Sequence, residues 1–475
     1  MGFAGLLIVG AVLAVLTWLR VRRRGEIDLV DWFVLSMAMF ICFGTAGVVV
    51  LLRDGNVGGI WPGLVARYDG QLWLYAPYAL ILVVSTWIGA ALAERSGRGM
   101  GRRATLEFQS GGGALRRGRI AHLAWFLLGL AIVCYWLYAR AYGGFGSLYE
   151  VGRLVRAGFS PGVENPLTFL QRFGSLAFVA AFLFWALRKL GSERRGRGLM
   201  DAVGFVGSFG FSIFVLYTWI GRVGLAVFVL TFPLGKALLR GSTESRLVGR
   251  MAIASVVGWA LIVGASGLLG LDRATGAFTD FVAQELAFPV ASFQAQVVDG
   301  TIRWFQDIVQ TPLYVLPQQL WASRWGLSTA SMFNTELLLG YRKGTGGVTG
   351  GIPIDMVTLG QMQAGIGGVV LVGLIWGYSL IRVGQSVIRI FPRGVREIVY
   401  AHITLQFAVL SAVYGDPLHI VVRNFHVFVL MIIYVCWSFL FGRAGVGWTE
   451  GVRAERSMVN RSKPGGAGAI RSESG

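Results

Sequence analysis

Residues 120–139 read IAHLAWFLLGLAIVCYWLYA, an uncharged and largely apolar run of 20 residues between Arg119 and Arg140. An α-helix of that length spans about 30 Å, which is the thickness of the hydrocarbon core of a bilayer. Comparable runs recur along the chain, and the core of a soluble protein does not need runs so long. The sequence therefore predicts an all-α protein, a polytopic bundle of membrane helices.

The overall composition agrees with a membrane protein. Of 475 residues, 55% are hydrophobic and 14% are charged, and the mean hydropathy is +0.63. A soluble protein carries about a quarter of charged residues. The net charge of +19 invites a nucleic-acid interpretation, but basic residues also gather in the cytoplasmic loops of membrane proteins. We favour the second explanation and expect no nucleic-acid partner.

Hydrophobic runs predict about 11 membrane spans. Their expected limits are Gly2–Leu19, Asp31–Leu52, Trp73–Leu92, Ile120–Ala139, Pro166–Ala186, Val203–Trp219, Val223–Leu239, Met251–Leu269, Leu359–Ile381, Ile398–Tyr414 and Phe425–Phe441. The stretch Gly2–Arg20 is followed at once by Arg22, Arg23 and Arg24, so we interpret the first run as a span and not as a cleaved signal peptide. The short link around Gly221 predicts a helical hairpin.

The expected organisation has four parts. Residues 1–270 hold about eight spans, residues 271–356 form a large periplasmic loop, and residues 357–442 hold about three spans. Residues 443–475 form a basic tail of polar composition, which predicts disorder.

The distribution of basic residues predicts the orientation of the chain. About 30 of the 43 basic residues fall on one side of the predicted bundle. The segments on that side are Arg20–Arg24, Arg95–Arg119, Arg188–Arg197, Lys236–Arg250, Arg382–Arg396 and the tail from Arg443. Because cytoplasmic loops carry the excess of Lys and Arg, we expect a periplasmic N-terminus and a cytoplasmic C-terminus in a bacterial inner membrane. An odd number of spans agrees with that orientation.

The large loop is too apolar for a disordered segment. Ala277–Phe288 repeats apolar residues at helical spacing, and Ala291–Val309 does so less regularly. Both segments predict short amphipathic helices that lie on the membrane or cap a cavity. The loop also holds tryptophans suited to anchoring at the interface, namely Trp304, Trp321 and Trp325.

Arginine outnumbers lysine on the predicted external side, and guanidinium groups bind phosphate in a bidentate manner. Arg222 is the foremost candidate, because it lies in the predicted hairpin turn with no acidic residue near it in sequence. Snorkelling of its long side chain to the interface is the structural alternative. Arg153 and Arg156 are three positions apart, so in a helix they would face one side. Loop anchoring is the commoner role of a single external arginine.

Other candidate groups are fewer. Gly344–Gly351 resembles a phosphate-binding loop in composition, although its order of residues is not that of a P-loop, and a hinge is the simpler interpretation. Candidate bases are Glu336, Asp355, Asp416, His402, His419 and His426. A single His or Asp near a helix end commonly serves as a cap or a core hydrogen-bonding group. Cys42, Cys134 and Cys436 lie in apolar runs without metal-ligand spacing, so we expect no disulfide, metal or cofactor.

Two stretches, and a shorter third one, resemble a known family. Arg342–Gly377 has a glycine-rich segment, then Ile-Pro, then an amphipathic stretch whose residues Ala364-Gly365-Ile366-Gly367 occupy a turn before the next span. Tyr217–Leu230 has an arginine that opens a short apolar span. Gly143-Gly144-Phe145 with Arg153 is similar to an external loop of the same family. Together with the predicted topology, these stretches resemble the Wzy-type O-antigen, or oligosaccharide repeat unit, polymerases, which are GT-C-like.

The resemblance implies a metal-independent glycosyltransferase that joins undecaprenyl-pyrophosphate-linked oligosaccharides at the periplasmic face. It implies Arg222 as the ligand of the donor pyrophosphate and His419 or Asp355 as the base. Further phosphate ligands would be Arg153, Arg156, Arg273 and Arg342. Expected partners are the lipid-linked oligosaccharides, membrane lipid and a chain-length regulator protein. An O-antigen ligase and a flippase or exporter of the same glycolipid are the alternatives, although the sequence lacks the repeated halves common in transporters.

Overall fold

A computed structural model describes residues 2–25, 27–53, 74–111, 117–156, 165–189, 195–220, 222–240, 278–316, 325–342 and 351–436. Regular structure in these ranges is helical, and none of the residues in them forms a strand. The predicted all-α fold is therefore confirmed for this part of the chain. Residues up to Val427 form one compact unit, and a second unit begins at Phe428, where residues 428–436 are helical.

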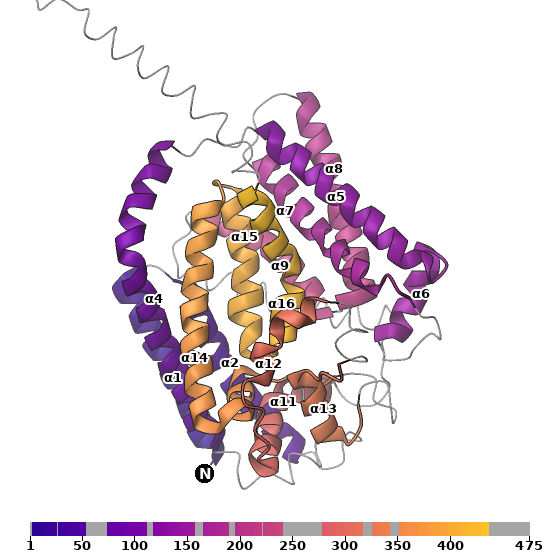
Figure 1. The fold of residues 1–475 in the computed structure, drawn as a ribbon. Helices are drawn as coiled ribbons and strands as arrows, with labels where there is room; N and C mark the ends of the chain where they lie inside the picture. Colours follow the sequence, from indigo (N-terminus) through magenta and orange to yellow (C-terminus); the bar gives the residue numbers. More distant parts are fainter. Residues whose placement is uncertain are drawn as a thin grey trace, which may run out of the picture. The chain divides into compact units, whose positions relative to one another are not determined.

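The longer helices form the bundle drawn in Figure 1. They are α1 (Gly2–Arg24), α2 (Leu29–Arg53), α4 (Tyr75–Gly111), α5 (Arg117–Arg140), α7 (Leu176–Lys189), α8 (Arg195–Val215), α9 (Arg222–Leu239), α11 (Phe278–Asp299) and α14 (Met356–Ile390). The shorter α-helices are α6 (Phe145–Arg156), α12 (Gln306–Val309), α13 (Ala330–Leu339), α15 (Val395–Ile403) and α16 (Pro417–Arg423). The described ranges also contain the 3-10 helices η2 (Thr168–Ser175), η4 (Thr311–Val315) and η7 (Leu410–Ala412) and the π-helices η3 (Leu216–Ile220) and η6 (Thr404–Val409).

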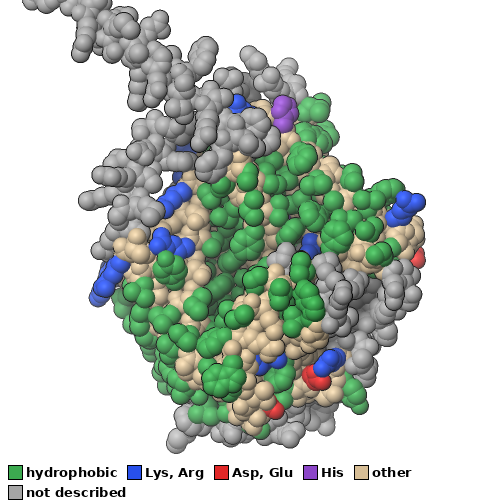
Figure 2. Space-filling model, viewed as in Figure 1, with side chains coloured by type: hydrophobic (Ala, Val, Ile, Leu, Met, Phe, Trp, Pro, Cys, Tyr) green, Lys and Arg blue, Asp and Glu red, His purple; other side chains and the backbone are tan. Residues whose placement is uncertain are grey.

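Seven helical segments are long and apolar enough to cross a membrane. They are Ala4–Arg24, Leu29–Val49, Tyr75–Ser96, Gly118–Arg140, Thr168–Lys189, Gly198–Thr218 and Met356–Ile390. Residues 417–436 make an eighth candidate, which is interrupted at Asn424. Apolar side chains also cover much of the face seen in Figure 2, where charged groups are few. The chain is therefore a multi-pass membrane protein.

The predicted number of about 11 spans is not reached within the described ranges. The predicted span Met251–Leu269 lies outside them. The apolar helix Val223–Leu239 is shorter than a full span. The predicted span Ile398–Tyr414 contains the end of α15, the π-helix η6 and the 3-10 helix η7. Changes of helical type interrupt a regular α-helix, and hydropathy alone does not detect them.

Glycines allow α4 and α14 to pack closely along their length. A Cβ atom at Gly377 would overlap the carbonyl oxygen of Thr86, and one at Gly373 would come within 2.7 Å of the carbonyl oxygen of Leu82. Small residues let two membrane helices approach until their backbones touch, and dispersion forces then favour the pair. The glycine-rich predicted ninth span is thus the packing surface of α14.

α14 is broken near its beginning, where it forms the hook seen at the lower end of Figure 1. Ala364 has φ −159° and ψ 40°, and Gly365 has φ 60° and ψ −141°, a conformation that is essentially restricted to glycine. The arm Met356–Gln363 folds back against the longer arm. The two backbones come so close that a Cβ atom at Gly368 would overlap the carbonyl oxygen of Gly360. The turn expected at residues 364–367 is therefore present.

α7 lies in the centre of the half of the bundle formed with α5 and α8, and every residue from Leu176 to Leu187 is buried. Side chains on all sides of this helix are apolar, which suits a position surrounded by other helices. α8 and α9 form the predicted hairpin, since the ring of Phe209 contacts those of Phe228 and Phe232.

Basic segments from distant parts of the chain meet at one end of the bundle. Arg24 pairs with Glu94 at 3.0 Å, and Arg382 donates to Ser96 Oγ at 2.7 Å. These contacts join three of the segments that were predicted to be cytoplasmic. The N-terminus lies at the opposite end, where α11, α12 and α13 gather in Figure 1.

The helices predicted in the large loop were expected to lie on the surface, but the structure places part of them in the core. One helix, α11, covers nearly all of the first segment and the first part of the second, as far as Asp299, and Pro289 lies within it. Its residues from Ala287 to Gln296 are buried, and Phe293 makes edge-on contacts with the rings of Tyr75 and Tyr78. α11 packs against α2 and α14, so this part of the loop belongs to the core. Periodicity indicated a helix, but only packing against the bundle shows which side chains become buried.

Candidate polar site at the α11–α13 end

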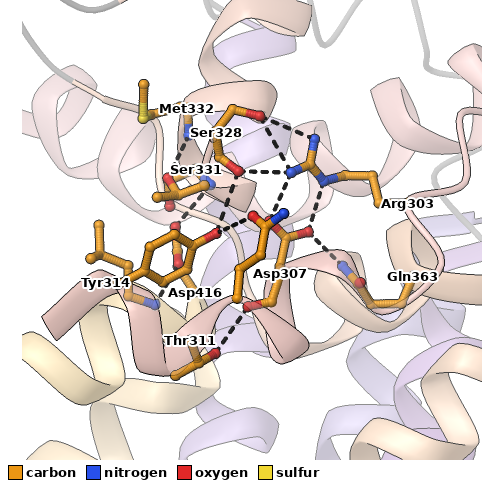
Figure 3. A network of polar contacts seen from close by, with 12 residues as sticks. Arg303, Asp307, Thr311, Tyr314, Ser328, Ser331, Met332, Gln363 and Asp416 are labelled. Carbon is orange, nitrogen blue, oxygen red and sulfur yellow. Dashed lines mark hydrogen bonds and ion pairs between the residues drawn. The ribbon is translucent and has the colours of Figure 1, made fainter. Parts of the chain in front are cut away.

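A buried ion pair lies at the end of the bundle that contains α12 and α13 (Figure 3). Arg303 donates through Nε to Asp307 Oδ2 at 2.7 Å and through Nη2 to Asp307 Oδ1 at 2.9 Å. Their side chains are 8% and 0% exposed. Nη2 also reaches the carbonyl oxygen of Ser328 at 2.8 Å. A bidentate pair with further hydrogen bonds is the arrangement in which a buried charge pair is tolerated.

The same pair holds the broken beginning of α14. Gln363 donates through Nε2 to Asp307 Oδ2 at 2.8 Å. The backbone N–H groups of Arg303 and Trp304 donate to the carbonyl oxygens of Met362 and Gln363 at 2.8 and 2.9 Å. Because the last carbonyls of a helical arm have no partner within that arm, these bonds satisfy them at the break. The segment that holds Arg303 and Asp307 is therefore joined to α14 through both backbone and side chains.

Tyr314 extends this network towards α16. Its hydroxyl donates to Gln310 Oε1 at 3.2 Å and lies 3.4 Å from the carbonyl oxygen of Ser328. Burial, with the negative charges of Asp307 and Asp416 nearby, raises the pKa of the phenol. The hydroxyl therefore stays protonated and acts as a donor in Figure 3.

Asp416 fixes the start of α16 and joins it to α13. Its carboxylate accepts the backbone N–H of Leu418 at 2.8 Å, which is an N-cap, and the backbone N–H of Ser331 at 2.8 Å. The residue is fully buried, and burial raises the pKa of the carboxyl group, which these bonds oppose. Asp416, one of the candidate bases, is thus a structural cap.

Asp355 caps α14 in a similar way. It accepts the backbone N–H groups of Val357 and Thr358 at 3.1 and 3.3 Å, and the Thr358 hydroxyl as well. Tyr75 Oη donates to its Oδ2 at 2.8 Å across 280 positions in sequence. Burial raises the pKa of Asp355 to about 6, against the opposing effect of these donors. The carboxyl group is 0% exposed.

The segments of the two predicted catalytic residues meet. The backbone N–H of Gly415 donates to the carbonyl oxygen of Ile354 at 2.7 Å. A Cβ atom at Gly415 would lie 2.9 Å from the carbonyl carbon of Asp355, so only glycine fits this crossing. The chain before Asp355 therefore touches the chain that leads into α16, where His419 lies.

α16 presents two polar side chains on one face. His419 and Arg423 are four positions apart, which places them one helical turn from each other. Both contact Tyr414: the His419 ring meets the tyrosine ring edge-on at 6.2 Å, and the Arg423 guanidinium lies 4.6 Å from its centroid. Tyr414, His419 and Arg423 define the α16 face.

A second guanidinium comes from η2. Arg172 donates through Nη2 to the carbonyl oxygen of Leu316, just after η4, and η4 packs against α16. The neighbouring Phe173 contacts Phe425 edge-on at 5.3 Å. Arg172 thus comes from a distant part of the sequence to an element that contacts the surroundings of α16, the helix that holds Arg423.

Deeper in the bundle, two histidines form a separate polar pair. Thr231 Oγ1 donates to the carbonyl oxygen of Val227 at 2.7 Å, so it accepts from His402 Nδ1 at 3.2 Å. Nε2 of His402 then accepts from Nε2 of His426 at 2.9 Å. Since His402 accepts through Nε2, its ring is neutral, as suits a buried imidazole, and the pair links α9, α15 and the segment after α16.

Of the remaining predicted site residues, the structure describes the side chain of Arg342. Arg342 is exposed and pairs with Glu336 at 2.9 Å. Arg153 and Arg156 lie in α6, so the segment is helical as their predicted shared face requires. Arg222 begins α9, after the π-helix η3. The positions of these three side chains lie outside what the structure describes, as do the whole of Arg273 and the glycine-rich segment 343–350.

Three arginines at this end were not in the predicted site, namely Arg172, Arg303 and Arg423. The spacing of Arg303 and Asp307, and of His419 and Arg423, is i, i+4, a pattern readable from sequence. That pattern carries little weight by itself, because exposed i, i+4 pairs are common. Burial makes it informative, and burial is a property of the fold.

Within the described ranges, no group of three or more His, Cys, Asp and Glu side chains is arranged to hold a metal ion. No family model, no curated protein and no solved structure matches this chain. The polar end of the bundle is therefore interpreted from its own geometry.

Proposed function

We propose that this protein is a glycosyltransferase that polymerises undecaprenyl-pyrophosphate-linked oligosaccharides into O-antigen or a related surface polysaccharide. The observation that carries the proposal is the contact between the Ile354–Asp355 segment and the Gly415 segment, at 2.7 Å between Gly415 N and Ile354 O. It brings the two predicted catalytic regions to one end of an apolar bundle. The proposal also takes the family resemblance of the sequence as its starting point.

The proposed orientation puts the α11–α13 end in the periplasm, with the N-terminus on that side and the C-terminus in the cytoplasm. Its support is the meeting of basic segments around Arg24, Ser96 and Arg382 at the other end. Because basic residues favour the cytoplasmic side, that end is assigned to the cytoplasm. The protein then lies in the inner membrane with about 11 spans in the whole chain.

His419 is the favoured base, because it lies on the α16 face, whereas Asp355 is fully buried and already accepts hydrogen bonds. In the proposed reaction, a hydroxyl of the acceptor unit attacks the anomeric carbon of the donor. A new carbon–oxygen bond forms as the bond to pyrophosphate breaks. The hydroxyl proton passes to His419 and then to the departing pyrophosphate. Asp355 acts by holding the start of α14.

The pyrophosphate needs cations, since negative charge grows on it as it leaves. Arg222, Arg153, Arg156, Arg273 and Arg342 remain the proposed ligands. Arg342 would have to exchange Glu336 for phosphate, and its pair with Glu336 is exposed and therefore weak.

The test is deletion of the gene in its host, followed by complementation and gel analysis of the surface polysaccharide. We expect the deletion to accumulate single repeat units, and His419→Ala and Arg222→Ala to fail to restore long polymer although the protein still inserts. Arg382→Gln, at the other end of the bundle, is the matched control and should restore it. Long polymer retained on its lipid carrier would indicate a ligase, and normal long polymer in the His419 and Arg222 variants would contradict the assigned roles.

A further inference from the structure

Arg423 is a half-buried cation that lacks a counter-ion. Its Nη1 atom is buried and has no hydrogen-bond partner among the described residues. Its guanidinium lies over the ring of Tyr414, 4.6 Å from the centroid. An aromatic face attracts a cation but accepts no strong hydrogen bond, so the ring does not satisfy the N–H groups of Nη1.

Two other enclosed arginines of the described chain have carboxylate partners. Arg303 pairs with Asp307, and Arg20 pairs with Asp28 and Asp31. No carboxylate lies within ion-pair distance of Arg423 in the described ranges. Asp416 is the nearest acidic residue in sequence, and its carboxylate is committed to the N–H groups of Ser331 and Leu418. It acts on Arg423 only through the longer-range field.

A charge held away from water is costly unless an opposite charge or good acceptors complete it. Arginine is suited to one kind of partner in particular, because its planar donors match two oxygens of a phosphate. His419 lies one turn away on the same face of α16 and offers a further nitrogen. Arg172, which is anchored to the carbonyl of Leu316 beside α16, adds positive charge to the region.

We propose that Arg423, with Tyr414 and His419, forms a binding site for a phosphate oxyanion on the α16 face. The ligand completes the half-buried guanidinium, and binding places a phosphate beside His419. Only the identity of the ligand rests on the proposed function: if that function holds, the phosphate belongs to the lipid-linked pyrophosphate. The site itself is independent of that reaction.

The experiment measures binding of inorganic pyrophosphate to the full-length protein in nanodiscs of neutral phosphatidylcholine, by calorimetry. We expect saturable binding that Arg423→Gln weakens about tenfold or more, because a charge-assisted bidentate contact is lost. Arg382→Gln at the other end of the bundle is the matched control and should bind as the native protein does. Native affinity in Arg423→Gln, or no saturable binding by the native protein in neutral lipid, would overturn the proposal.

Arg423→Lys covers the case in which Arg423→Gln does not fold. Lysine keeps the charge but loses the planar fork, so we expect binding to weaken severalfold, and unchanged affinity would overturn the site. Nanodiscs with phosphatidylglycerol distinguish the source of the phosphate. Loss of pyrophosphate binding there indicates that a lipid headgroup occupies the site, and retained binding indicates selectivity for pyrophosphate.

The polysaccharide assay separates this inference from the proposed function. Weakened pyrophosphate binding with normal polymer in Arg423→Gln cells would support the site and contradict the assigned reaction. Native binding with no polymer would contradict the site while leaving the reaction intact.

Discussion

Replacing Arg303 by methionine should loosen the end of the bundle around α12 and the break in α14. The substitution keeps a long aliphatic side chain but removes the two bonds to Asp307, at 2.7 and 2.9 Å, and the bond to the Ser328 carbonyl. Asp307 would keep a single side-chain donor, Gln363 Nε2, at 2.8 Å. A fully buried carboxylate would then face the bundle with one neutral partner.

Breaking a buried ion pair on one side costs about 3–5 kcal/mol. Each 1.4 kcal/mol corresponds to about a tenfold change in an equilibrium, so local opening should become about 10²- to 10⁴-fold more frequent. The exposed pair of Arg342 and Glu336 offers a matched control, with side chains 63% and 46% exposed. Arg342→Met should change the opening equilibrium by about 1 kcal/mol or less, which is about fivefold.

Hydrogen exchange with mass spectrometry measures the effect on the native bundle in nanodiscs. The reporting amides are those of Arg303 and Trp304, which donate to Met362 and Gln363. Peptides over residues 300–316 should exchange much faster in Arg303→Met than in Arg342→Met. The double variant Arg303→Met/Asp307→Leu removes both charges and should recover most of the protection. Acceleration of less than about tenfold in Arg303→Met, or equal acceleration in the two single variants, would refute this account of the ion pair.

Three further predictions concern packing, protonation and metal. Gly377→Ala should destabilise the protein by about 1–3 kcal/mol, because its Cβ would overlap Thr86 O. Gly367→Ala should not destabilise it, because a Cβ atom there would have nothing within 4 Å. Thermal denaturation in detergent compares the two variants, and equal midpoints would argue against close packing of α4 and α14. Burial raises the pKa of Asp355 from 3.8 to about 6, so between these two pH values the folded state holds a proton that the unfolded state has released. The protonated carboxyl group therefore contributes stability that is fully present below pH 3.8 and is lost as the pH rises through about 6. Intrinsic-rate-corrected exchange at Val357 and Thr358 should therefore rise between pH 4 and 7 and become pH-independent in Asp355→Asn; the same slope in both proteins would contradict it. Under the proposed function, chelation should not inhibit polymerisation by the purified protein, and strong EDTA inhibition relieved by Mg²⁺ or Mn²⁺ would contradict the proposed metal-free mechanism.

Several properties were predictable because they depend on neighbours in sequence. An apolar run such as residues 120–139 must be satisfied by its own helix in lipid, so it specifies a span without reference to the rest of the chain. The turn at Ala364–Gly365 was also expected, and glycine there permits the positive φ of 60°. The α8–α9 hairpin followed from the short link around Gly221. In each case the physical cause is local.

The candidate site was predicted less completely. Asp355 and His419 were singled out, and their segments do meet, but the fully buried position of Asp355 and its bond to Tyr75 were not foreseen. Tyr75 is 280 positions away, so no local pattern can indicate it. Arg423 and Arg172 were missed as site residues because an arginine is informative only when its burial and its partners are known.

The sequence alone determined that this chain is helical, multi-pass and strongly asymmetric in charge, because hydrophobicity and charge act residue by residue against lipid and water. Tertiary structure alone decided that α11 enters the core, that Arg303 has a counter-ion and that Arg423 lacks one in the described ranges. The physical reason is desolvation: the energy of a charge depends on which distant segments exclude water from it, and only folding brings those segments together.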